Sequence, residues 1–286
     1  MKRTNWTRHI ARGLGVVAML YVAACTYMWA MQKQIVFLPS PILQTTPDRL
    51  GMKFEELRIA VGEGRDKAEL HGWWIPAKKT GAATLLCLHG NYRNIANNIE
   101  HTLRLHDFGY NLLLVDYRGF GKSTGSPSEE YTYQDAEAAW QYLVKARNIK
   151  PSQAFIYGHS LGGSIAVDLA THHPETAGVI TESAFTSMQA MGEIEYGFLP
   201  VGLLLNQRFD TFEKIKQLKI PLLIIHGTWD KKVPVAMAQQ LYVAAPQPKS
   251  LLLIEGGEHN NSGAVGWLEY RDALSNFVLK YSGSEQ

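Results

Sequence analysis

The sequence predicts an α/β protein with a mostly parallel, doubly wound sheet, an N-terminal antiparallel hairpin and a small helical cap. From Thr84 onward, short and nearly continuous apolar runs alternate with segments of helical period. Strands buried on both faces give such runs, and repeated strand–helix alternation gives a parallel sheet covered by helices. Residues 54–79 differ, because apolar and polar positions alternate on both sides of a glycine-rich turn, which indicates an antiparallel hairpin.

Six apolar runs mark the expected parallel strands, and five segments mark the helices between them. The runs cover residues 84–90, 110–117, 154–160, 177–183, 221–227 and 250–257. The helical segments cover residues 94–109, 132–147, 162–175, 234–245 and 267–282. With 286 residues, of which 46% are hydrophobic, the chain suits one large α/β domain or two small ones with a sizeable core.

One stretch interrupts this alternation. The stretch from about residue 185 to 218 is too long for a plain loop in a compact domain. Its apolar residues are interrupted by the sequence FLPVG, which should break a helix. Long insertions of this kind are usually functional covers over a site. We interpret the stretch as a small helical cap, and the alternative is an ordinary longer helix packed on the sheet.

The N-terminal segment differs from the rest of the chain. Residues 1–12 carry four basic side chains, and residues 13–31 follow without a single charge. About 20 apolar residues suffice for a helix to cross the hydrocarbon of a bilayer. We therefore expect a basic cytoplasmic N-terminus at 1–12, a transmembrane anchor at 13–31, a connector at 32–54 and the folded domain at 55–286.

The charge balance predicts the orientation of this anchor. Lys33 stands alone just after the span, so the four basic residues before it should keep the N-terminus in the cytoplasm, with the domain on the periplasmic or extracytoplasmic side. Two alternatives stay open. A cleaved secretory signal would have a shorter apolar stretch. The sequence VAAC, ending at Cys25, resembles the box of bacterial lipoproteins, in which the cysteine is lipidated.

Composition excludes several classes of function. The formal net charge is +2 and no basic stripe lies on an expected helix, so we expect no nucleic-acid partner. The two cysteines, Cys25 and Cys87, make no disulfide framework, and no CxxC, HExxH or other metal spacing is present. We therefore expect neither a metal nor a cofactor, and the sequence leaves the oligomeric state open.

Three glycines surround one serine in the segment GHSLGG, between an expected strand and an expected helix. Gly158 and Gly162 stand two positions before and after Ser160, where they leave room for a sharp strand-to-helix turn. Such a turn presents the serine hydroxyl above the sheet edge. The amide of Leu161 then lies at the helix N-terminus, where it points at any oxyanion that forms.

A serine hydroxyl needs a base, and a group that orients this base, before it becomes a good nucleophile. In this arrangement the acid and the histidine follow at later strand ends, the acid first. Asp230 and His259 each follow one of the last two apolar runs. We expect both to join Ser160, and Glu182, at another strand end, is the alternative acid.

A second oxyanion donor should come from the loop after an early strand. Gly90 lets the chain turn tightly after His89, and the amide of Asn91 is our candidate donor beside that of Leu161. We expect His89 to organise this loop. His159 should point with its strand, away from the serine.

In this order, the segments HGN, DYRGFGKS, GHSLGG, TESAFTS, HGTWDKKVP and GGEHN resemble the α/β-hydrolase superfamily. More narrowly, the chain resembles its single-pass, membrane-anchored members, which include bacterial inner-membrane hydrolases and eukaryotic protein depalmitoylases. The resemblance covers nearly the whole chain. It implies the α/β-hydrolase fold, a Ser-Asp-His triad at Ser160, Asp230 and His259, and structural roles for Asp116 and Arg118.

This resemblance implies a serine hydrolase of carboxylesterase or thioesterase type, which acts through an acyl-enzyme on acylated or lipid-like substrates at a membrane. A serine peptidase or an acyltransferase on the same fold, and a non-catalytic binding or scaffold protein, are the alternatives. The sequence departs from the family at Tyr92 and Arg93, which are bulky where many relatives have a small, glycine-containing turn. The shape of the acyl pocket therefore does not carry over.

Overall fold

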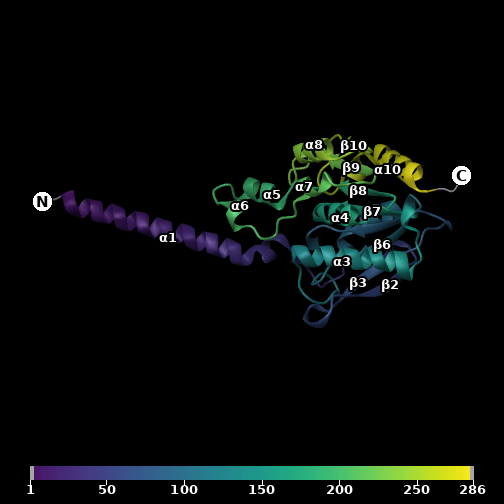
Figure 1. The fold of residues 1–286 in the computed structure, drawn as a ribbon, viewed down its shortest axis with the longest axis horizontal. Helices are drawn as coiled ribbons and strands as arrows, with labels where there is room; N and C mark the ends of the chain where they lie inside the picture. Colours follow the sequence, from purple (N-terminus) through teal and green to yellow (C-terminus); the bar gives the residue numbers. More distant parts are fainter. Residues whose placement is uncertain (1–2, 284–286) are drawn as a thin grey trace.

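The structure is a computed structural model that describes residues 3–283, with side chains from Trp6 onward (Figure 1). Within these residues, the domain is built on an eight-stranded sheet of order β10-β9-β8-β7-β4-β6-β3-β2. Its strands are β2 (Glu55–Val61), β3 (Ala68–Ile75), β4 (Thr84–Leu88), β6 (Asn111–Val115), β7 (Ala154–His159), β8 (Gly178–Glu182), β9 (Leu222–Gly227) and β10 (Lys249–Ile254). β4 and β6 to β10 are parallel, whereas β3 pairs antiparallel with both β2 and β6.

The hairpin and the parallel strands differ in burial as their sequences predict. Along β2, exposed residues alternate with the buried Leu57, Ile59 and Val61. All residues of β4 and of β9 are buried. A strand with one solvent face alternates, and a strand covered on both faces does not.

Helices cover both faces of the sheet (Figure 1). They are α2 (Ile99–Asp107), α3 (Glu129–Gln141), α4 (Leu161–His172), α8 (Val235–Ala244), α9 (Ser262–Val265) and α10 (Trp267–Tyr281). Trp140 of α3 belongs to one buried cluster and Leu274 of α10 to another. Successive residues of β4 belong to these two clusters in turn. Because alternate residues of a strand point to opposite faces, one cluster lies on each side. The doubly wound fold class predicted from the sequence is thus confirmed.

The smaller elements are mostly turns that join the strands and helices. Single helical turns cover Pro47–Leu50, Gly64–Asp66, Ile95–Asn98, Tyr142–Ala146 and Pro151–Gln153. A separate short ribbon pairs β1 (Leu38–Pro39) with β5 (Tyr92–Arg93) in parallel. This ribbon joins the chain just after the N-terminal helix to the loop that follows β4.

The N-terminal helix α1 (Arg3–Val36) extends away from the domain (Figure 1). Its segment Trp6–Val36 is long and apolar enough to cross a membrane, with a mean hydropathy of 1.7 in its most apolar stretch, and none of that stretch is buried. Residues 32–36, expected in the connector, continue this helix. Of the expected basic N-terminus, Lys2 lies outside the described residues.

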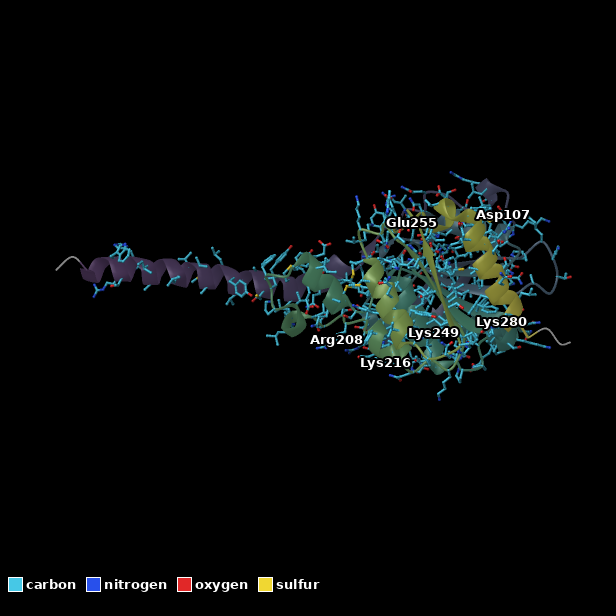
Figure 2. The ribbon with its side chains drawn as sticks, turned by 90° about the horizontal axis from the view of Figure 1, so that it is seen from above. Asp107, Arg208, Lys216, Lys249, Glu255 and Lys280 are labelled. Atoms are coloured by element: carbon cyan, nitrogen blue, oxygen red, sulfur yellow. The ribbon has the colours of Figure 1, made fainter. Side chains whose placement is uncertain are left out.

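The stretch between β8 and β9 forms three short helices rather than one longer helix. They are α5 (Met188–Glu195), α6 (Val201–Leu204) and α7 (Thr211–Ile215). The hydroxyl of Thr211 is hydrogen-bonded to that of Ser164 in α4, which fixes α7 on the domain. α5 and α6 lie instead beside the C-terminal part of α1, in both of two perpendicular views (Figures 1 and 2).

Candidate active site

Ser160 stands at the turn between β7 and α4 with a backbone conformation that is unusual for a residue with a side chain. Its φ is 55° and its ψ is −120°. The turn is crowded on both sides. A Cβ atom on Gly158 would lie 2.1 Å from the carbonyl oxygen of Gly162, and one on Gly162 would lie 2.0 Å from that of Leu88. Side chains at these two positions would therefore displace the backbone that holds Ser160.

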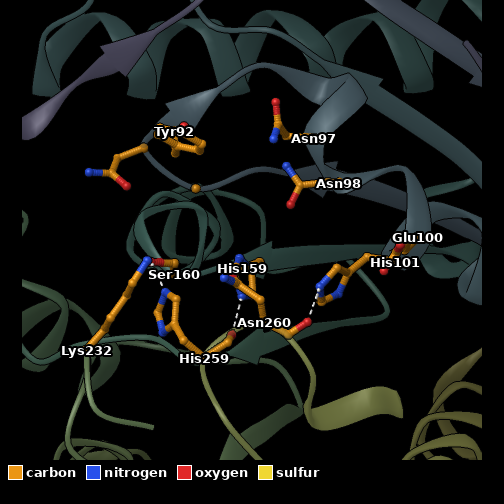
Figure 3. Close-up of a pocket in the computed structure, with 12 residues that line it drawn as sticks. Tyr92, Asn97, Asn98, Glu100, His101, His159, Ser160, Lys232, His259 and Asn260 are labelled. Carbon is orange, nitrogen blue, oxygen red and sulfur yellow. Dashed lines mark hydrogen bonds between the residues drawn. The ribbon is translucent and has the colours of Figure 1, made fainter. Parts of the chain in front are cut away.

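The structure brings together the three side chains that the sequence nominated, although they come from three different strand ends. His259 Nε2 lies 3.0 Å from Ser160 Oγ, and His259 Nδ1 lies 2.7 Å from Asp230 Oδ2. The bond between Ser160 and His259 is drawn in Figure 3. With the proton of the imidazole on Nδ1, the ring donates to the carboxylate and accepts from the serine hydroxyl.

Asp230 is held by its own loop as well as by the histidine. Its Oδ1 accepts hydrogen bonds from the amides of Lys232 and Val233, both at 2.9 Å. Burial alone would raise the pKa of this carboxyl. The pKa is nevertheless lowered, mainly by the hydrogen bond and charge of His259. The hydrogen bond from the Val233 amide and the charge of His226 act in the same direction. Asp230 is therefore an ionised acceptor that fixes the orientation of the imidazole.

Glu182, the alternative acid, is engaged elsewhere. Its carboxylate is fully buried and accepts hydrogen bonds from the hydroxyls of Tyr157, at 2.5 Å, and Tyr270, at 2.7 Å. Among the described residues, the carboxylate that binds the His259 ring is that of Asp230. The geometry therefore favours Asp230 as the acid.

Two histidines that the sequence analysis did not place in the site hold the loop of His259. His159 Nε2 donates to the carbonyl oxygen of His259 at 2.9 Å, and His101 Nε2 donates to that of Asn260 at 3.1 Å (Figure 3). Burial, followed by the charge of His101, lowers the pKa of His159 to about 3, so this ring is neutral. As expected, His159 does not bond to Ser160, and it contacts the loop of the base instead.

The loop after β4 lies directly against the serine. A Cβ atom on Gly90 would lie 3.4 Å from that of Ser160, and both Asn91 and Leu161 line one cavity with the serine. His89 is buried and its Nδ1 donates to the carbonyl oxygen of Gly90 at 2.7 Å, an arrangement that stiffens the turn. The two nominated amides therefore belong to residues beside the nucleophile.

The same loop is tied to the end of the N-terminal helix. The side-chain amide of Asn91 donates to the carbonyl oxygen of Val36 at 2.8 Å, and the amide of Leu38 donates to the Asn91 carbonyl at 2.9 Å. Tyr92 and Arg93, the bulky residues of this loop, contact each other through a hydrogen bond of 3.0 Å. Tyr92 nevertheless lines both cavities that contain Ser160, as the departure from the family pattern at this position implies.

Asp116 and Arg118 are buried in the loop that follows β6. Asp116 accepts the amide of Ile95 at 2.8 Å and faces His89 at 3.5 Å. Arg118 pairs with Asp135 at 3.0 Å. Asp116 therefore ties its loop to the segment after β4, and Arg118 ties the same loop to α3, which are structural contacts of the kind that the family resemblance implies.

Two cavities meet at Ser160 and His259. The first has a volume of about 250 Å³ and is lined largely by polar residues (Figure 3). Its further lining includes Asn97, Asn98, Glu100, His101 and Asn260. The second, of about 460 Å³, extends under the cap, and its further lining includes Leu38, Phe185, Met188, Met191 and Val233. Within the described residues, no group of three or more His, Cys, Asp or Glu side chains is placed to hold a metal ion.

Comparison with known proteins supports the same assignment of family. A family model described as serine aminopeptidase, S33, matches residues 80–212. The uncharacterized protein MT2364 of Mycobacterium tuberculosis is 31% identical over 269 residues, which cover 93% of this chain and 94% of that relative. The α/β hydrolase domain-containing protein WAV2 of Arabidopsis thaliana is 26% identical over 287 residues, which cover 92% of each chain.

Among solved structures, the esterase Pf2001 of Pyrococcus furiosus superposes with a TM-score of 0.68 at 22% identity. The match covers 87% of this chain and 98% of that one, and at this identity it shows the shared fold. The sheet order, the turn at Ser160 and the relatives agree with the motifs read from the sequence. The chain belongs to the α/β-hydrolase superfamily.

Proposed function

We propose that this protein is a membrane-anchored serine hydrolase that cleaves ester or thioester bonds of acylated, lipid-like substrates. The observation that carries the proposal is the chain of hydrogen bonds from Ser160 through His259 to Asp230, placed where a mainly apolar cavity and a more polar cavity meet. An ester with an apolar acyl group and a polar leaving group has the same two-sided character.

The reaction would proceed by two acyl transfers. His259 Nε2 accepts the proton of the Ser160 hydroxyl as its oxygen attacks the carbonyl carbon, and then gives that proton to the leaving alcohol or thiol. A water molecule, activated by the same nitrogen, releases the acid from the acyl-enzyme. The amides of Leu161 and Asn91 would bind the oxyanion, and each such donor typically contributes about 2.7–4 kcal/mol to transition-state stabilisation. The steps use protein groups and water.

The cavity under the cap would hold the acyl chain. Met188 and Met191 stand three residues apart on α5, so they lie on one face of that helix and both line the cavity. Flexible methionine side chains adapt to apolar ligands of different shape. The polar cavity, with its asparagines and His101, would hold the leaving group.

The exposed apolar helix α1 supports a membrane anchor. Arg8 and Arg12 before the span, against Lys33 after it, support a catalytic domain on the periplasmic or extracytoplasmic side. Lipidation of Cys25, a half-buried free thiol, is the alternative attachment. It would be detected as added mass on the mature chain from membranes.

An aminopeptidase is the second candidate, because the matching family model carries that description. A free α-amino group would need an anion on the acyl side of the serine, and Glu195 lines the cavity under the cap. Lys231 and Lys232 line the same cavity and oppose a cationic substrate. Aminoacyl anilides tested beside acyl esters separate the two activities. An acyltransferase would follow the same steps with an alcohol in place of water.

We expect the full chain in detergent to react with a fluorophosphonate probe and to hydrolyse acyl esters, and Ser160→Ala to lose both. The loss in kcat should be about 10³-fold or more, since the variant lacks the nucleophile. Ser126→Ala, at an exposed position outside both cavities, is the matched control. Equal labelling of Ser160→Ala would contradict the proposal, and the absence of hydrolysis in the parent chain would favour the binding-protein alternative.

Asp230→Asn should lower kcat by about 10⁴-fold, because an amide no longer holds the imidazole in the required tautomer. Glu182→Gln should lower kcat less than about tenfold, because Glu182 does not contact the His259 ring and the Gln amide oxygen still accepts from a tyrosine hydroxyl. Steady-state kinetics on one acyl ester compares both variants. The reverse order of effects would make Glu182 the acid.

Met191→Trp should shorten the space available to an acyl chain. Excluding two methylene groups costs about 1.6 kcal/mol, so kcat/KM for long-chain esters should fall about tenfold, while acetate esters are hydrolysed at an unchanged rate. Ile194→Trp is the matched control on the same helix, since Ile194 is 54% exposed and lines neither cavity. A uniform effect of Met191→Trp on all chain lengths would show that the acyl chain lies elsewhere.

His159→Gln should change how stability depends on pH. The folded protein holds the pKa of His159 at about 3, below the ordinary value of 6.5, so between these values the unfolded chain binds more protons. Stability therefore falls as the pH falls through this range, by up to about 1.4 kcal/mol per pH unit from this residue. Gln keeps a donor for the His259 carbonyl but cannot titrate. Denaturant unfolding from about pH 4 to about pH 7 should give a shallower slope for the variant, and parallel slopes would contradict this.

A further inference from the structure

The cap carries an apolar surface that the catalytic domain does not cover. Ile194, Phe198 and Leu203 are 54%, 71% and 87% exposed. No charged residue occurs from Tyr196 to Gln207. Exposed apolar side chains that gather on one short segment often mark an interaction site.

This surface is fixed along the N-terminal helix rather than turned away from it. The Tyr21 hydroxyl donates to the carbonyl oxygen of Phe198 at 3.2 Å. The Gln32 side chain donates to the carbonyl oxygen of Leu204 at 2.6 Å and accepts the amide of Asn206 at 2.7 Å. α6 therefore lies beside the C-terminal half of α1, as both views show (Figures 1 and 2).

The position of these contacts along α1 determines how deep the cap would lie in a bilayer that α1 crosses. The uncharged part of the helix runs from Gly13 to Gln32, between Arg12 and Lys33, and about 20 residues are needed to cross the hydrocarbon. At about 1.5 Å per residue, Tyr21 lies about 18 Å along the helix from Lys33. If α1 crosses a bilayer from Gly13 to Gln32, Tyr21 lies among the lipid tails. The cap loop that is hydrogen-bonded to Tyr21 then lies at the same level.

A narrow apolar crevice separates the cap from α1. Its volume is about 80 Å³. It is lined by Met28, Gln32 and Val36 of α1 and by Met188, Tyr196 and Leu204 of the cap, among others. Met188 also lines the cavity at Ser160. One flexible side chain thus borders both the crevice and the catalytic cavity.

We propose that the cap segment Tyr196–Leu205 is embedded in the hydrocarbon of the bilayer beside α1, as a second membrane-binding element. The inference rests on the membrane anchoring of the proposed function. The crevice then opens to lipid, and an acyl chain leaving the leaflet passes Met188 to reach Ser160. The occupant of the exposed cap surface is the bilayer, because the cap is fixed beside the segment of α1 that would cross it.

Environment-sensitive NBD labels on the full chain test this placement. In a Cys25→Ala background, in which the remaining Cys87 is buried, single cysteines replace Leu203, Val17 or Leu279. All three side chains are apolar and exposed, and Leu279 lies on α10 of the catalytic domain. The protein is reconstituted into phosphatidylcholine vesicles with or without nitroxide on the acyl chains.

We expect labels at positions 203 and 17 to lose most of their fluorescence to nitroxide lipid, and the label at 279 to keep it. A quenched label at 17 with an unquenched label at 203 would overturn the inference and leave the anchor intact. An unquenched label at 17 would instead overturn the anchor, and the inference with it. A blue-shifted but unquenched label at 203 would show a protein partner or a second copy on the cap.

Leu203→Asp gives a functional readout that does not depend on labels. Since Leu203 is 87% exposed, the substitution leaves no cavity in the fold. Hydrolysis of a long-chain acyl ester carried in phosphatidylcholine vesicles should fall about tenfold, because a carboxylate is unfavourable among lipid tails. Hydrolysis of water-soluble p-nitrophenyl acetate should not change, and Leu279→Asp should affect neither substrate. Unchanged activity of Leu203→Asp on the vesicles would contradict the proposed route.

Discussion

The close approach of three backbone segments around Ser160 is the constraint on which the rest of the site depends. Gly162, in the first turn of α4, lies so close to the Leu88 carbonyl that no side chain fits between them. This contact places the start of α4 and the end of β4 together, and with them the loop that carries Asn91. A non-glycine residue at positive φ costs about 1–3 kcal/mol, and such strain persists only where the surroundings fix it. Here the buried parallel strands β4 and β8, on the two sides of β7, do so.

His259, the proposed base, is held by contacts to its backbone as well as to its ring. The ring of His259 is set by Asp230, and its carbonyl oxygen is held by His159. The ring of His159 contacts that of His101. The buried carboxylate of Glu182 lies 3.9 Å from Nδ1 of His101. A neutral imidazole donates one hydrogen bond without bringing a charge beside the base. The loop after β10 is thereby fixed from both sides, although it belongs to the edge strand of the sheet.

Sequence patterns predicted what depends on periodicity and chain order. Continuous apolar runs indicated the parallel strands, and the fold then required an acid and a histidine at later strand ends. Chain order favoured Asp230, and Glu182 stayed the alternative acid because it also stands at a strand end. The hydroxyls of Tyr157 and Tyr270, distant in sequence, engage Glu182, while Asp230 binds the His259 ring. The role of His101 was not predictable either, since it bonds to a main-chain carbonyl, which leaves no pattern in the residue types.

The contacts of the N-terminal helix argue that attachment and catalysis share one structural unit. A helix joined to the domain by a flexible linker would leave the distance from the catalytic serine to the membrane free. Here α1 remains helical to Val36, whose carbonyl oxygen accepts from the side chain of Asn91, while Gln32 holds the cap. The C-terminal end of the proposed anchor therefore contacts both the loop of Asn91 and the cap over the cavity at Ser160. If α1 is the anchor that we propose, its depth in a bilayer sets the depth of Ser160.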